Sequence, residues 1–289
     1  MHDFASKLKA VVEASRPLIW LLSITSAYCG MFMAVKRVPP LHLLIVVAIG
    51  VGPCITVATN LLNAVYDIDV DRLSKPKRPL PTGRMSAAST LKIALLLYLL
   101  GLIIAFSLGF WPFLITLIGV IISALYSIPR TKIKAKGGFS NFSLALGYTA
   151  ICILGGWAIF REIQEMPWLI LVFLTIQDAG ANVVKDFVDY EADKKFRFDT
   201  LPVKLGVEKS IMLISPFFVG IYLLIPLFYF LGYLGSIYLP ISLFFAWGIY
   251  IIGSLFHDFS RKNREKIFLQ AFFMSVLTEI AFTIAYVLA

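Results

Sequence analysis

The chain alternates long apolar stretches with shorter polar ones, and the apolar stretches continue to its last residue. A helix needs about 20 residues to cross the roughly 30 Å hydrocarbon core of a membrane. The apolar runs are continuous rather than alternating, which favours helices over the strands of a membrane barrel. The sequence therefore predicts an all-α integral membrane protein, a bundle of nine transmembrane helices. The predicted spans are approximately 17–35, 41–65, 91–110, 112–126, 142–160, 167–184, 210–231, 236–256 and 267–289.

The basic residues gather on one side of this predicted arrangement. With the N-terminus inside, the inside segments hold all of the 26 Lys and Arg residues except Lys36, Arg37 and Arg161. Cytoplasmic loops of membrane proteins carry such an excess. We therefore expect a multi-pass protein of the cell membrane whose N-terminus lies in the cytoplasm. The two longest polar connections, 66–90 and 185–209, lie on the same side, and long loops commonly carry function.

Composition supports this picture and narrows the function. Hydrophobic residues make up 59% of the chain and charged residues 15%, against roughly 45–50% and 25% in soluble domains. The net charge of +9 follows from the basic loops, so it gives no reason to expect a nucleic-acid partner. The three cysteines lie in apolar runs without CxxC spacing, which argues against a zinc site or a disulfide framework. We expect one transmembrane domain over residues 1–289, with residues 1–16 as an N-terminal interfacial segment.

Acidic motifs close the second and the sixth predicted helices, on the cytoplasmic side. Asn63, Asp67 and Asp71 are spaced by four residues, so a helix places them on one face, whereas Asp69 points elsewhere. The two helix ends share the pattern Asn-x-Val-x-Asp, which indicates a weak internal repeat. The stripe at the end of the sixth helix consists of Asn182, Asp186, Asp189 and Asp193.

Stacked carboxylates repel one another, so a positive partner must hold the two stripes together. Carboxylate and amide oxygens suit hard cations such as Mg²⁺, which shares its coordination shell with substrate phosphates. A solvated helix end would explain one aspartate, but not two stripes followed by long basic loops. The pattern indicates a magnesium-dependent diphosphate site, although the same cations also fit a role in topology or lipid contact. The proline-rich loop after the first motif contains four basic residues that can reach the oxygens of a phosphate: Lys75, Lys77, Arg78 and Arg84.

These motifs resemble those of the UbiA superfamily of intramembrane prenyltransferases. The NxxxDxxxD motif that the family carries after its second helix is matched by Asn63, Asp67 and Asp71, and its DxxxD motif after the sixth helix is matched by Asp189 and Asp193. Ala64 departs from many members, which have a second Asp there, but this position lies off the stripe. Further matches, from Arg16-Pro17 onward, are Arg78-Pro-Leu-Pro-Thr-Gly, Tyr126-Ser-Ile-Pro-Arg-Thr-Lys and Thr200-Leu-Pro-Val-Lys-Leu-Gly.

The resemblance implies a bundle with a central cavity and an enzyme that transfers prenyl groups, which are alkyl groups other than methyl. A polyprenyl diphosphate donor would enter from the bilayer, and two Mg²⁺ ions would bridge its diphosphate to the motifs. Asp186 belongs to the implied catalytic set, as a metal ligand, a base or a partner of Lys185. The implied metal ligands, which are also catalytic, are Asn63, Asp67, Asp71, Asp189 and Asp193. The implied diphosphate-binding residues are Arg78, Arg84, Tyr126, Arg130, Lys132 and Lys185.

The acceptor is lipophilic, and the motifs leave its identity open. The stretch Lys136-Gly-Gly-Phe-Ser-Asn-Phe-Ser-Leu-Ala-Leu-Gly resembles the chlorophyll-synthase and archaeal ether-lipid branches of the family. We favour the ether-lipid branch, which implies a geranylgeranyl donor and a geranylgeranylglyceryl phosphate acceptor. A chlorophyllide or an aromatic quinone precursor is the alternative. Tyr66, Tyr126 and Trp157 are candidates to shelter the allylic cation.

Other classes fit parts of the pattern. An ion-coupled transporter would explain the paired Asn/Asp stripes and the repeat, but its carboxylates would lie near the bilayer midplane rather than beside basic loops. A CDP-alcohol phosphotransferase needs an Asp-Gly start and an Ala-Arg pair before its later aspartates, and the sequence has neither. A non-catalytic assembly protein would have no use for six aligned polar positions. Prenyl transfer accounts for more of the sequence than these alternatives do.

Overall fold

The computed structural model of the protein describes residues 2–131 and 133–289. In this part of the chain, nine helical spans are long and apolar enough to cross a membrane, and all nine match the predicted ones within a few residues. The spans are α2 (Pro17–Val35), α3 to α4 (Leu41–Tyr66), α6 (Ala87–Leu108), α7 (Phe110–Ser127), α8 to α9 (Gly138–Trp157), α10 (Trp168–Val188), α13 to α14 (Val207–Phe230), η6 with α15 (Ser236–His257) and α16 (Arg261–Leu288).

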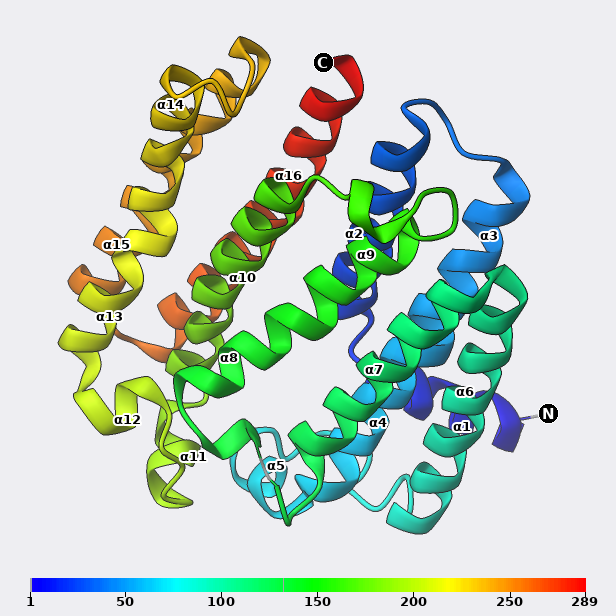
Figure 1. The fold of residues 1–289 in the computed structure, drawn as a ribbon. Coiled ribbons are helices and arrows are strands. Elements are labelled where there is room, and N and C mark those ends of the chain that lie inside the picture. Colours follow the sequence, from blue (N-terminus) through cyan, green and yellow to red (C-terminus); the bar gives the residue numbers. More distant parts are fainter. Residues whose placement is uncertain (1, 132) are drawn as a thin grey trace.

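The polar connections contain short helices of their own. The segments that were expected to be loops after the second and sixth spans include α5, α11 and α12, and α1 precedes the first span. Figure 1 places α5, α11 and α12 together at one end of the bundle, and the C-terminus at the other end. The bounds of these elements are α1 (His2–Ala14), α5 (Ile68–Ser74), η2 (Ile133–Ala135), η4 (Ile163–Glu165), α11 (Tyr190–Lys195) and α12 (Leu201–Leu205).

Three of the spans contain a wider, π-helical turn. These turns are η1 (Gly50–Thr56), η3 (Leu146–Ala150) and η5 (Pro216–Gly220). Pro53 lies inside η1, where its missing N–H would otherwise break the helical ladder. Within this turn the Thr56 hydroxyl donates to the carbonyl of Val51 at 2.8 Å. The turns divide their spans into α3 (Leu41–Ile49) and α4 (Val57–Tyr66), α8 (Gly138–Ala145) and α9 (Ile151–Trp157), and α13 (Val207–Ser215) and α14 (Ile221–Phe230).

Large apolar side chains cover the outside of the bundle as well as its core. On α6, Leu95, Leu99, Ile103 and Phe106 recur at helical spacing and are all exposed. A water-soluble protein would not expose such a stripe, whereas lipid solvates it. The structure thus agrees with the composition in indicating a multi-pass membrane protein.

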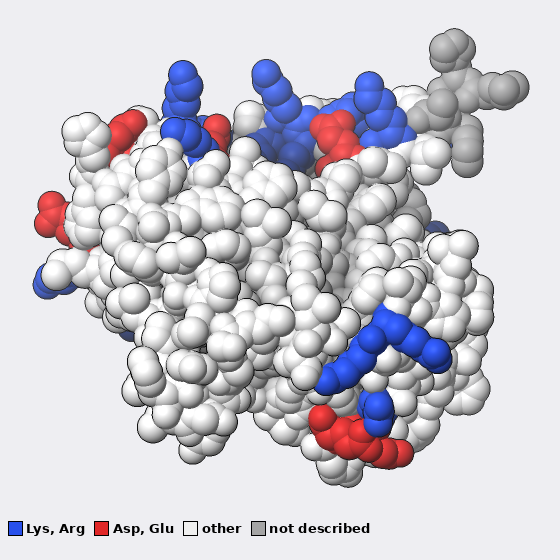
Figure 2. All heavy atoms as spheres, turned by 90° about the horizontal axis from the view of Figure 1, so that it is seen from above, with Lys and Arg blue, Asp and Glu red and all other residues white. Residues whose placement is uncertain are grey.

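The end of the bundle near the C-terminus carries few charges. Figure 2 views this end and shows a largely uncharged surface, with one group of basic and acidic side chains at the lower right and further charged side chains along the upper and left edges. Helix α2 ends here with Lys36, whose ammonium lies 4.9 Å from the ring centre of Tyr286. Arg161 pairs with Glu165 at 3.2 Å and donates to the carbonyl of Ala34. The contrast with the other end agrees with the predicted asymmetry of basic residues.

Two glycines let α2 and α9 approach until their backbones touch. A Cβ atom on Gly30 would lie 2.0 Å from the carbonyl oxygen of Ile153, and a Cβ atom on Gly156 would lie 2.0 Å from that of Ala27. Small residues permit such close helix packing in membranes. Because the obstructing atoms belong to backbone, a side chain can be accommodated only if the helices separate.

We expect Gly30→Ala and Gly156→Ala each to lower the stability of the protein by about 1–3 kcal/mol, the range for overpacked sites. Thermal unfolding in detergent measures this loss. Gly253→Ala is the matched control, because a Cβ atom at this position of α15 meets no atom within 4 Å. Equal melting temperatures for all three variants would contradict the proposed close packing.

Candidate active site

The two acidic motifs line one polar pocket at the end of the bundle where α5, α11 and α12 lie (Figure 1). The first motif extends from α4 into α5, and the second extends from α10 into α11. Loop residues complete the walls. The pocket is lined by Arg16, Asn63, Asp67, Val70, Asp71, Lys75, Tyr126, Lys134, Lys185, Asp186, Asp189, Asp193, Phe198 and Thr200.

Each motif contains a helix break at its first shared aspartate. Asp67 separates α4 from α5 with φ −105° and ψ 9°, and Asp189 separates α10 from α11 with φ −89° and ψ 5°. The helical hydrogen bonds resume across both breaks, from Asp71 N to Asp67 O at 2.7 Å and from Asp193 N to Asp189 O at 3.0 Å. By position relative to the helix break, Asp67 therefore corresponds to Asp189, and Asp71 corresponds to Asp193. The alignment of Asn63 with Asn182 that the shared pattern suggested does not follow the helix breaks.

Basic side chains from the loops neutralise the motif carboxylates. Arg78 donates to both oxygens of Asp71 at 2.8 and 2.9 Å. The ammonium of Lys75 lies 2.6 Å from an oxygen of Asp189, so the loop after the first motif reaches the second one. Lys134, from η2, forms an ion pair with Asp67. These ion pairs connect the two motifs across the pocket and explain how so many carboxylates can lie close together.

The aspartates of the second motif differ in their electrostatic surroundings. Burial alone would raise the pKa of Asp189, but the charges of Lys75 and Lys185 outweigh it and lower this pKa to about 2. Burial raises the pKa of Asp193 to about 7, although the charge of Lys185 acts in the opposite direction. Asp189 is therefore firmly ionised near neutral pH, while Asp193 takes up a proton more readily.

Asp186 and the junction after it are held from neighbouring helices. The carboxylate of Asp186 is buried and accepts a hydrogen bond of 2.8 Å from the side-chain amide of Asn141, on α8. Arg264, at the start of α16, donates to the carbonyl of Phe187 at 2.7 Å and to Glu191 at 2.6 Å. These contacts fix the last turn of α10 and the first turn of α11, and with them the aspartates of the second motif.

The pocket suits a hard cation that completes its shell with substrate oxygens. Several anionic and amide side chains that line it offer oxygen, which Mg²⁺ prefers over nitrogen or sulfur: Asn63, Asp67, Asp71, Asp189 and Asp193. Within the described residues, no three Asp, Glu, His or Cys side chains converge closely enough to form a metal cage by themselves. This arrangement fits Mg²⁺, which commonly takes one or two carboxylates together with water and substrate phosphates.

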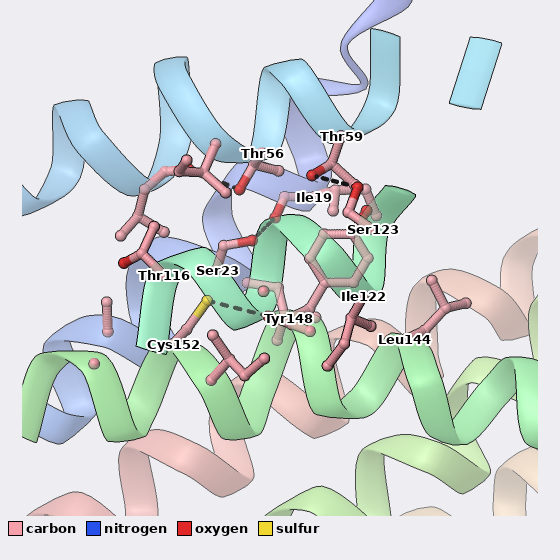
Figure 3. A pocket seen from close by; sticks show the side chains of 18 of the residues that line it. Ile19, Ser23, Thr56, Thr59, Thr116, Ile122, Ser123, Leu144, Tyr148 and Cys152 are labelled. Carbon is pink, nitrogen blue, oxygen red and sulfur yellow. Dashed lines mark hydrogen bonds between the residues drawn. The ribbon is translucent and has the colours of Figure 1, made fainter. Parts of the chain in front are cut away.

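A larger cavity adjoins the polar pocket in the membrane-spanning part. The two spaces share four lining residues, Arg16, Asn63, Tyr126 and Lys185. The space inside the cavity, including the space at its opening, is about 1580 Å³, against about 460 Å³ for the polar pocket. Figure 3 shows part of the wall, where Ile19, Ile122 and Leu144 lie beside hydroxyl-bearing side chains. The sequence had implied this central cavity through its family resemblance.

Comparison with known proteins decides the family. The sequence matches the model of the UbiA prenyltransferase family over residues 23–277. The chain belongs to the UbiA prenyltransferase family. It is therefore an enzyme that transfers prenyl groups, as the family resemblance implied.

The relatives include two kinds of UbiA enzyme. The chain is 34% identical over 230 residues to digeranylgeranylglyceryl phosphate synthase of Sulfolobus acidocaldarius, covering 78% of this chain and 80% of the relative. It is 32% identical over 166 residues to chlorophyll synthase of Arabidopsis thaliana, covering 55% of this chain and 43% of the relative. A solved UbiA homologue from Archaeoglobus fulgidus, bound to GPP and Mg²⁺, has the same fold, with a TM-score of 0.75, 22% identity, and coverage of 97% and 100%.

Not all predicted site residues of this UbiA protein reach the pocket. Arg84 instead binds Glu13 at 2.7 Å and the carbonyl of Lys77 at 2.8 Å. Arg130 is exposed and does not line the pocket, and Lys132 lies outside the described residues. Arg78 does not line the pocket either, but it contacts the pocket through Asp71. The diphosphate-binding roles of Arg84, Arg130 and Lys132 therefore stay predictions without support from their positions.

Two of the candidate aromatic residues also lie elsewhere. Tyr66 lines neither the pocket nor the cavity. Trp157 is buried and donates its indole N–H to the carbonyl of Glu162. Tyr126 lines both spaces, and Tyr148, which was not predicted, lines the cavity. Tyr126 and Tyr148 are thus the tyrosines placed to face a reacting group.

The sequence argument missed two basic residues of the site, Lys134 and Arg16. Lys75 was expected to reach phosphate oxygens, but its place beside Asp189, like that of Lys134 beside Asp67, comes from the fold. Arg16 lines both spaces and adopts a left-handed backbone conformation with φ 54°. Such a conformation is uncommon outside glycine and marks functional sites. An arginine directly before the proline that begins α2 was the available signal.

Proposed function

We propose that this enzyme transfers a geranylgeranyl group from its diphosphate to geranylgeranylglyceryl phosphate in a Mg²⁺-dependent reaction of ether-lipid synthesis. The position of the polar pocket directly beside the apolar cavity carries this proposal. The pocket offers cations and carboxylates for a diphosphate, and the cavity beside it offers apolar walls for long prenyl chains. Arg16, Asn63, Tyr126 and Lys185 mark the boundary at which the two parts of the donor would meet.

Oxygen atoms of side chains at the pocket would hold the metal. We infer two Mg²⁺ ions, because there are two motifs. Asn63, Asp67 and Asp71 would hold it from one side, and Asp189 and Asp193 from the other. When bound there, Mg²⁺ supplies positive charge that stabilises the departing diphosphate. The paired arrangement of the helix breaks supports this division, because it presents both DxxxD segments to the same pocket in the same way.

The basic residues of the pocket would bind the diphosphate and stabilise it as it leaves. Lys75, Lys134 and Lys185 line the pocket, and Arg78 borders it. As the allylic C–O bond breaks, its electron pair goes to the diphosphate, and nearby cations stabilise the developing negative charge. The acceptor hydroxyl then forms the new C–O ether bond and loses its proton. Apolar walls keep water from competing for the allylic carbon.

The acceptor assignment rests on the relatives and on one further residue. Digeranylgeranylglyceryl phosphate synthase matches a larger share of this chain than chlorophyll synthase does. Arg16 lies between the pocket and the cavity, and its buried Nε has no hydrogen-bond partner among the described residues. A guanidinium with free donors suits the phosphate of this acceptor. A chlorophyllide, which carries a carboxylate, is the second candidate. We place the pocket on the cytoplasmic side, where the basic loops lie.

An acceptor panel tests the function directly. We expect the purified protein to release diphosphate from geranylgeranyl diphosphate only with Mg²⁺ and with geranylgeranylglyceryl phosphate, and EDTA to abolish this turnover. Chlorophyllide and an aromatic quinone precursor are the comparison acceptors. Turnover with one of them alone would replace the acceptor but keep the reaction. The proposal would be refuted if the protein showed no turnover with any acceptor and no Mg²⁺-dependent binding of the donor.

A further inference from the structure

Three hydroxyl groups meet at the wall of the apolar cavity, one turn below the first acidic motif. They belong to Thr59 on α4, Tyr98 on α6 and Ser123 on α7. The Tyr98 and Ser123 oxygens lie 2.5 Å apart, and each also lies close to Thr59 Oγ1, at 3.2 and 3.1 Å. Figure 3 shows the contact between Thr59 and Ser123 on the cavity wall. Tyr98 stands behind them and does not line the cavity.

The hydrogen-bond directions leave one proton available. Tyr98 and Ser123 have one hydroxyl proton each. One of these protons fills the 2.5 Å contact between them, and the other is donated to Thr59. Thr59 is the donor in neither of its contacts, so it keeps its own proton for donation. Neighbouring hydroxyls on the wall differ, because those of Ser23 and Thr56 donate to carbonyls of their own helices at 3.2 and 2.8 Å. Thr59 lines the cavity and is partly accessible from it.

The position of Thr59 indicates which part of a substrate it can meet. It lies four residues before Asn63 on the same helix, which is about 6 Å deeper in the membrane. Asn63 lines both the pocket and the cavity, whereas Thr59 lines the cavity alone. A ligand atom beside Thr59 is therefore just below the diphosphate, where the prenyl chain begins. The hydrocarbon part of the donor offers nothing that can accept a hydrogen bond there, whereas a glycerol-ether acceptor carries oxygens that can.

We propose that Thr59 donates its hydroxyl proton to an ether or hydroxyl oxygen of the acceptor, and that Tyr98 and Ser123 hold Thr59 in the orientation for this bond. This inference rests on the proposed prenyl transfer and names its acceptor subsite. The subsite selects an acceptor with an alcohol or ether oxygen next to its nucleophile, as in a glycerol ether. Tyr98 is a positioning residue, because it reaches the acceptor only through Thr59.

Substitution of Thr59 by valine tests the subsite, because it removes the hydroxyl and keeps the shape. We expect Thr59→Val to weaken binding of geranylgeranylglyceryl phosphate roughly tenfold, the effect of one lost hydrogen bond, with unchanged binding of geranylgeranyl diphosphate and Mg²⁺. Thr59→Ser should restore acceptor binding, and Tyr98→Phe should weaken it by a smaller factor. Equilibrium binding of each labelled substrate to protein in nanodiscs, without turnover, provides the readout.

Thr175→Val is the matched control, because Thr175 lies in a membrane helix outside the cavity and donates to its own helix at Leu171. Equal acceptor affinities of wild type and Thr59→Val, or equal losses in Thr59→Val and Thr175→Val, would overturn the subsite. Binding of both substrates without turnover would instead count against the proposed function and leave the subsite intact. Failure of the wild type to bind the acceptor would overturn the subsite together with the acceptor assignment.

Discussion

Asp67→Asn and Asp189→Asn are each expected to lower Mg²⁺-dependent turnover by about a thousandfold, which corresponds to roughly 4 kcal/mol of transition-state stabilisation. Both residues occupy helix breaks at the pocket, and both hold a loop lysine by an ion pair. An asparagine keeps the size of the side chain but removes its charge. In the proposed mechanism the metal then loses a charged ligand, and the partner lysine loses its counter-ion, so the diphosphate would be stabilised less as it leaves.

Asp69→Asn provides the control for this experiment. Asp69 lies between the two aspartates of the first motif, but its side chain is 80% exposed and pairs with Arg72 on the surface. We expect this variant to keep wild-type turnover and the same Mg²⁺ dependence. Initial rates over a series of Mg²⁺ concentrations separate weaker metal binding from slower chemistry. Unchanged rates in Asp67→Asn and Asp189→Asn would contradict the proposal that the two motifs form a metal site.

The fold was predictable because lipid imposes simple rules on the chain. Each span must satisfy its backbone polar groups internally and must be long enough to cross the hydrocarbon layer. The nine predicted spans therefore match the structure, and the errors lie at helix ends. The shortest predicted span, 112–126, begins at Phe110 and ends at Ser127 in the structure. Short helices such as α5 and α11 escaped prediction because a polar, acidic segment gives no apolar signal.

The acidic part of the site was predictable for a similar reason. Helical spacing placed Asn63, Asp67 and Asp71 on one face, and the structure brings them to the pocket with Asp189 and Asp193. The basic part was harder, because many loop cations satisfy the same pattern. Which lysine meets which carboxylate depends on contacts between distant segments. Lys75 and Asp189, for example, are 114 positions apart in the sequence.

The structural role of Arg264, which contacts the second motif, could not be predicted from the sequence. Arg264 looked like one of several basic residues in the last cytoplasmic connection, where topology alone explains a positive charge. In the structure its side chain is 2% exposed and contacts the end of α10 and the start of α11. A charge that lies this deep requires specific partners. The distinction between a topological and a structural arginine therefore appears only when the helices are packed.

Arg264→Met should raise the Mg²⁺ concentration for half-maximal activity about tenfold or more, which is the scale of one lost hydrogen bond to a charged group. The last carbonyls of a helix have no partners within it, and Arg264 supplies one to Phe187 at 2.7 Å. Its guanidinium also lies 4.6 Å from the ring centre of Phe259, which holds it in place. Without these contacts, the junction at Asp189 gains freedom, and ordering it again costs part of the metal-binding free energy.

Arg264→Lys and Lys262→Met separate this effect from a general loss of stability. Lysine keeps the charge but cannot donate to Phe187 and Glu191 with the same fork geometry, so we expect an intermediate shift. Lys262 is exposed at the start of the same helix, and its substitution should change nothing. The decisive readout is the Mg²⁺ activation curve, measured together with thermal unfolding for each variant. A lower melting temperature with an unchanged Mg²⁺ activation curve would show that Arg264 stabilises the fold but does not position the second motif. A shifted curve at similar stability would establish it as the residue that positions the second motif.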